Sequence, residues 1–135
     1  MIEPRRSVTR FVKAIVRAEV SRSGGVEDSR VAERITMRLH KELGKLIGPA
    51  GIDVLLARSV VLARRAHPVL AGITAGPGGA LGGLDNAALE GAELQEGAMA
   101  IVSHFIELLV SLIGEDLAMD LVRTVWPVAA EEQDR

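Results

Sequence analysis

The residues of this chain best suited to chemistry are a histidine, a carboxylate and two serines within one apolar segment. His104 and Glu107 are spaced i, i+3, and Ser103 and Ser111 belong to the same polar arc. A histidine, a carboxylate and a hydroxyl can act as base, orienting group and nucleophile, but neighbours on one helix do not normally aim three side chains at one reacting atom. We therefore interpret them as the polar outer face of an amphipathic helix and predict that the protein is not an enzyme.

The sequence contains no metal-binding motif. Its histidines, His40, His67 and His104, are far apart, form no HExxH motif, and have no cysteine to complete a ligand set. We predict no bound metal and no cofactor.

A glycine-rich stretch divides the chain. Six of the twelve residues from Gly72 to Gly83 are glycine, but neither GxxxxGK[ST] nor GxGxxG is present, so a phosphate-binding loop is not indicated. We interpret residues 68–84 as a flexible or loosely ordered linker, with too many breakers for helix or strand. On this interpretation, replacing Gly78 and Gly79 with alanine changes the free energy of unfolding by no more than about 1 kcal/mol.

Two stripes of cations are the strongest functional signal. If they lie side by side, they form a continuous positive patch that could bind phosphates or another anionic partner. The alternative is that Glu90, Glu93 and Glu96, in the same chain or in a second copy, occupy the cations. The nine candidate anion- or partner-binding residues, which recur at helical spacing, are Arg6, Arg10, Lys13 and Arg17 in the first stripe and Arg30, Arg34, Arg38, Lys41 and Lys45 in the second.

Charge is sorted along the chain. Residues 1–67 hold 14 of the 16 Lys and Arg and 7 of the 18 Asp and Glu, a net charge of +7, whereas residues 68–135 carry −9. This asymmetry, hidden within a formal net charge of −2, points to an electrostatic partner: nucleic acid, an anionic membrane, a second copy or the chain's own other half.

Helical periodicity accounts for most of the sequence and predicts a single all-α domain, a compact bundle of about five helices with one long Gly-rich connection. Turns are expected at Gly24–Gly25, Gly48–Gly51 and Gly114. The helix after Pro49 is apolar almost all round, so we expect it to lie centrally. The predicted parts are basic helices over about 7–67, the linker over about 68–84, apolar helices over about 85–127 and an acidic tail over 128–135.

The segment Met99–Ile113 has an apolar arc about 200° wide, which predicts a homo-oligomer, with a dimer favoured. The apolar run Ala98–Ile113 is 16 residues long, shorter than the roughly 20 that a spanning helix needs, so we interpret it as a core helix and predict no transmembrane segment. The N-terminal sequence does not resemble a signal peptide, and cysteine is absent, so we expect a cytoplasmic location.

These features predict a non-enzymatic regulatory or scaffolding protein that acts through helix packing with itself or with a protein partner. The alternative is a nucleic-acid-binding domain that uses the basic stripes. The net charge of −2 and the lack of a recognisable nucleic-acid-binding module speak against the alternative.

Overall fold

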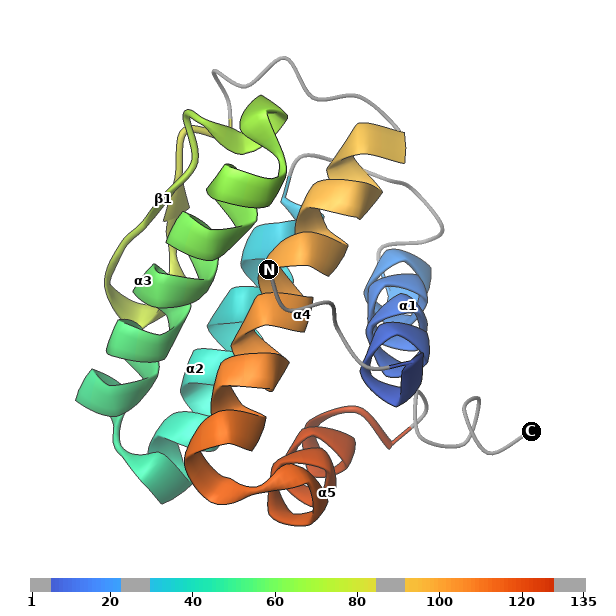
Figure 1. Ribbon diagram of the computed structural model, residues 1–135, viewed down its shortest axis with the longest axis vertical. Helices are drawn as coiled ribbons and strands as arrows, with labels where there is room; N and C mark the ends of the chain where they lie inside the picture. The colour runs from blue at the N-terminus through green and yellow to red at the C-terminus, as the bar shows by residue number, and fades with distance from the viewer. Residues whose placement is uncertain (1–5, 23–29, 85–91, 128–135) are drawn as a thin grey trace.

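The computed structural model describes residues 6–22, 30–84 and 92–127, and these residues form an all-α bundle (Figure 1). The predicted fold class is thereby confirmed. The five α-helices are α1 (Arg6–Arg22), α2 (Val31–Ile47), α3 (Pro49–Ala66), α4 (Ala92–Ile113) and α5 (Glu115–Val125).

The helices form where apolar residues recur at helical spacing, and the turns expected at Gly48–Gly51 and at Gly114 separate α2 from α3 and α4 from α5. The turn expected at Gly24–Gly25 and the acidic tail expected over 128–135 lie outside the described residues. Val8, Val12 and Ile15 are buried along one side of α1. Gly114 adopts φ +93° between α4 and α5, a conformation that costs least at glycine. The predicted break at Gly114 is therefore confirmed, and it lets the apolar stripe of α5 turn back towards α4.

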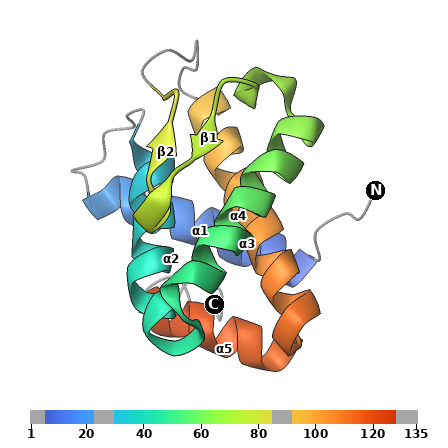
Figure 2. The same ribbon diagram turned by 90° about the vertical axis from the view of Figure 1, so that its left-hand side faces the viewer.

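Helix α4 is the centre of the bundle. It packs against α1, α2, α3 and α5, and Figures 1 and 2 show it running alongside α2 and α3 while α1 crosses on one side and α5 crosses one end. The expectation that α3 lies centrally is wrong, because Val54 on its outer side is 69% exposed. The wide apolar arc of α4 is covered largely by helices of the same chain, so it is no longer an argument for a dimer.

The Gly-rich segment, interpreted from its composition as a flexible or loosely ordered linker, forms a short hairpin. Strands β1 (Thr74–Ala75) and β2 (Leu81–Gly82) pair antiparallel, with Thr74 opposite Gly82 and Ala75 opposite Leu81. Two 3-10 turns, η1 (Pro68–Leu70) and η2 (Pro77–Gly79), precede β1 and form the tip between the strands. The prediction of neither helix nor strand is therefore wrong for this segment.

The physical reason is a small second core beneath the hairpin. Leu70 precedes the first of these glycines, and Ile73 and Leu81 lie between them. All three are buried together with Val60 of α3 and Ile101 of α4. Three apolar side chains are enough to dock such a short segment on helices that already exist. In Figure 2 the hairpin lies over the side of α2 and α3.

Among the described helices, one stretch, Gln95–Ile113, is long and apolar enough to cross a membrane by length and composition alone. Half of that window is buried inside the bundle.

Candidate interaction surface

The cations of α1 point away from the core. Arg10, Lys13 and Arg17 are exposed on the side of the helix opposite its buried residues. Within the described residues, Arg10 and Lys13 form no ion pair. The fourth predicted member, Arg6, begins α1, and its side chain falls outside the part of the chain that is described.

The cations of α2 have different environments. Arg34 and Arg38 are partly buried, and Lys41 is exposed and forms no ion pair within the described ranges. Three of the five predicted cations pair with glutamates of the basic half itself: Arg38 Nε with Glu19 Oε1 at 2.7 Å, Arg30 Nη1 with Glu33 Oε1 at 2.8 Å, and Lys45 Nζ with Glu42 Oε2 at 3.5 Å.

The structure does not bring the two stripes together at Arg38. This arginine meets Glu19 on the buried side of α1, whereas the α1 cations occupy the opposite side of that helix. Of the acids proposed to cover the stripes, Glu93 and Glu96 are exposed and form no ion pair with any described residue. Glu90 lies outside the described residues.

Glu19 is a buried carboxylate that sequence alone did not single out. Its side chain is 1% exposed, and Oε1 accepts hydrogen bonds from Arg38 Nε at 2.7 Å and from Trp126 Nε1 at 3.1 Å. These bonds join α1, α2 and the residue after α5, and they compensate the burial of a carboxylate. The burial of Glu19 could have been predicted from its position, because it lies four residues after Ile15 on the apolar side of α1.

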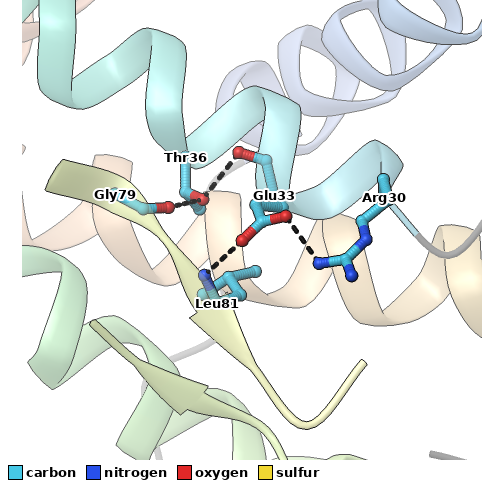
Figure 3. Close-up of polar contacts among 5 residues, drawn as sticks. All are labelled: Arg30, Glu33, Thr36, Gly79 and Leu81. Carbon is cyan, nitrogen blue, oxygen red and sulfur yellow. Dashed lines mark hydrogen bonds and ion pairs between the residues drawn. The ribbon is translucent and has the colours of Figure 1, made fainter. Parts of the chain in front are cut away.

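A second polar group holds the hairpin on α2 (Figure 3). Glu33 Oε2 accepts a hydrogen bond from Leu81 N at 2.9 Å while its Oε1 pairs with Arg30. Thr36 Oγ1 lies 2.6 Å from Gly79 O and 3.0 Å from Glu33 O. A hydroxyl has one proton to donate, so we assign the bond to the shorter contact, which crosses from helix to hairpin.

Helix α3 supplies the third contact to the hairpin. Gly78 N donates to Asp53 Oδ1 at 3.2 Å, and His40 Nε2 of α2 lies 3.1 Å from the same oxygen. That approach suits an ion pair when the imidazole is protonated, but its angle is not that of a hydrogen bond. We call Glu33, Thr36 and Asp53 the hairpin anchors. Each contacts the backbone of the hairpin.

The residues around His104 do not form a catalytic arrangement. His104 and Glu107 are partly exposed on α4, Ser111 is exposed, and Ser103 is buried, so the four do not share one outer face as expected. Burial lowers the pKa of His104 below its ordinary value of 6.5, the charge of His67 lowers it further, and Glu107 opposes both effects. Within the described residues, no group of three potential ligands could hold a metal ion.

The outer side of α3 combines apolar exposure with unpaired positive charge. Val54 and Val61 are 69% and 36% exposed, and Arg58 and Arg65 are exposed beside them. Neither arginine forms an ion pair within the described part of the chain. We call the strip formed by Val54, Ala57, Arg58, Val61 and Arg65 the α3 outer face; Figure 2 views the molecule from the side on which α3 lies.

The α3 outer face continues into the turn that follows the helix. An open depression of about 350 Å³ is lined by Val61, Arg64, Arg65, Pro68 and Ala71. Val69, in the same turn, is 45% exposed. The sequence predicted a central helix here because its apolar residues lie almost all round. The placement of Val54 and Val61 opposite the buried side, at Ile52 and Leu56, indicates the exposed apolar strip.

The α3 outer face is therefore the candidate interaction surface among the described residues. Comparison of the chain with protein-family models, with curated proteins and with solved structures finds no match, so this surface is characterised by its own residues alone.

Proposed function

We propose that the protein is a non-enzymatic regulatory or scaffolding protein that packs against a second copy of itself or against a protein partner through the α3 outer face. The observation that carries the proposal is the exposure of Val54 and Val61 next to Arg58 and Arg65. Exposed apolar residues scattered singly are ordinary on protein surfaces, but a strip of them beside arginines resembles the composition of protein interfaces.

The organisation of the bundle supports this choice of surface. Helix α1 buries its apolar stripe, and α4 is surrounded by neighbouring helices along most of its length. Helix α3 is different because it carries apolar residues on both its inner and its outer side. A partner that covers Val54 and Val61 would remove this apolar area from water, at about 25 cal/mol per Å².

Site-specific photo-crosslinking in the native cell tests the proposal. A photoreactive amino acid at position 54 should give a specific adduct, whose mass identifies either a second copy of the chain or a different protein. The matched control is position 46, because Leu46 is also an exposed apolar residue, 66% exposed, but lies at the end of α2. Equal or absent adducts at the two positions would contradict the proposal.

A second candidate function, nucleic-acid binding, rests on one specific observation. Arg10, Lys13 and Lys41 are exposed and form no ion pair within the described residues. If they contact phosphates, the protein should bind duplex DNA or RNA with an affinity that falls steeply with salt. The variant in which all three are replaced by glutamate should lose this binding with an unchanged melting temperature. That result would replace the scaffolding proposal.

A further inference from the structure

Two more exposed apolar residues lie near the turn between α4 and α5. Leu112 and Leu117 are 63% and 52% exposed, on either side of Gly114. Asp116 and Asp120 are exposed next to them on α5, and Asp120 forms a surface pair with Arg123 at 3.3 Å. We call Leu112, Asp116, Leu117 and Asp120 the α5 outer face. It combines apolar side chains with carboxylates, whereas the α3 outer face combines apolar side chains with arginines.

The two faces are complementary in charge but cannot meet within one molecule. Figure 1 shows α3 along one edge of the bundle and α5 across its lower end, and the two helices are not among those that pack closely together. Contact between them therefore requires two copies. Asp116 forms no ion pair within the described residues, and the pair that Asp120 makes is a solvent-exposed one that can exchange partners at little cost.

A symmetric contact between two α3 outer faces is the competing arrangement. Arg58 lies midway between Val54 and Val61, so a two-fold axis through this strip brings Arg58 of both copies together, with Arg65 and Arg64 adding more positive charge. No described carboxylate is part of the strip to offset this repulsion. Asp53, which lies next to Val54, is occupied by Gly78 N and His40.

We propose that the partner of the α3 outer face is the α5 outer face of a second copy of this chain. This inference rests on the proposed function and specifies its partner. The apolar residues Val54 and Val61 then pack against Leu112 and Leu117 of the other copy, and arginines of one copy face aspartates of the other. Such unlike-charge contacts set the orientation of the two copies more than their affinity. The sorting of positive charge into the first half of the chain and negative charge into the second half matches this arrangement.

Charge reversal with light scattering after size exclusion tests the proposal. The wild type should associate at micromolar concentration and physiological salt, and the association should weaken as salt is raised. The variants R58E/R65E and D116K/D120K should each associate at least tenfold more weakly. An equimolar mixture of the two variants should recover association, because the reversed α3 outer face of one then meets the reversed α5 outer face of the other.

Two double reversals are matched controls. R10E/K13E changes two exposed cations on α1, and E93K/E96K changes two exposed acids on α4; none of these four residues forms an ion pair within the described ranges. Both controls should associate like the wild type. Melting temperatures should be measured for all variants, since lysine at position 116 opposes the dipole at the start of α5. Recovery in the mixture excludes misfolding as the cause of the loss.

Four results would overturn the inference. A monomeric wild type rules out self-association altogether. Association of both variants at the wild-type level would leave self-packing in place but assign it to other residues. Failure of the mixture to recover association would show that the two faces do not contact each other. A crosslink from position 54 to a different protein would keep the proposed function while rejecting a second copy as the partner.

Discussion

Replacing Gly79 with alanine is the sharpest test of the ordered hairpin. Gly79 has φ +83° and is buried against α2, where an added Cβ would lie 2.5 Å from Thr36 O and 2.7 Å from Met37 Cα. These neighbours are helix backbone and cannot move aside as a flexible side chain would. The hairpin tip must therefore shift, and the hydrogen bond from Thr36 Oγ1 to Gly79 O is lost with it.

The expected cost follows from two contributions. A non-glycine residue at positive φ costs about 1–2 kcal/mol, and the loss of one buried hydrogen bond costs about 1–2 kcal/mol. We expect Gly79→Ala to lower the free energy of unfolding by about 3 kcal/mol, against a total of about 5–15 kcal/mol for a typical domain. This expectation replaces the one drawn from composition, which allowed at most about 1 kcal/mol for alanine at both glycines.

Gly78 provides the matched control for this experiment. It also has positive φ, +70°, but no atom lies within 4 Å of an added Cβ. Gly78→Ala should therefore lose only the conformational contribution of about 1 kcal/mol. Urea unfolding followed by circular dichroism measures both variants. A difference of less than about 0.5 kcal/mol between them would refute the argument that Gly79 is in close contact with α2.

Three further variants test two polar contacts and the partly buried His104. Glu33→Ala should lower the free energy of unfolding, measured by urea unfolding, by about 2 kcal/mol, because it leaves Leu81 N without its carboxylate acceptor. A loss below about 0.5 kcal/mol would contradict the role of Glu33 in anchoring the hairpin. Trp126→Phe keeps an aromatic ring but removes the donor to Glu19, and should cost about 2 kcal/mol; an unchanged urea midpoint would argue against that bond. Burial lowers the pKa of His104, so its contribution to the free energy of unfolding is complete above pH 6.5 and is lost as the pH falls from there through the folded-state pKa. His104→Gln should therefore flatten the loss of stability between pH 7.5 and 5. An equally steep loss of stability in the variant would show that other groups cause it.

The helices and their breaks could be predicted because they depend on local information. Apolar residues at helical spacing locate α1 and α2, and Gly114 marks the break before α5. Which helix lies at the centre depends instead on how the five are arranged. Helices α3 and α4 both have wide apolar surfaces in sequence, but only α4 is surrounded by neighbours. Composition likewise gave no indication of the hairpin, because its order comes from contacts with α2 and α3 that are more than 20 residues away in sequence.

The candidate surface could be predicted only in part. Spacing identified the basic stripes, but it could not reveal that Arg38 is engaged by a buried carboxylate 19 residues earlier. The α3 outer face was overlooked because apolar residues on both sides of a helix are equally compatible with a central helix and with an exposed binding surface. Exposure distinguishes the two, and it is a property of the assembled bundle.

Trp126 gives the protein a built-in optical reporter. It is the only tryptophan in the chain, is 1% exposed, and donates to Glu19 where α1, α2 and the end of α5 come together. Its fluorescence emission should therefore be blue-shifted while this junction is intact, and should move to longer wavelength when α1 separates from the bundle. Because the α3 outer face belongs to a different helix from this junction, charge changes there should leave the emission unaltered. One spectrum of each variant then distinguishes a lost contact between molecules from a lost fold.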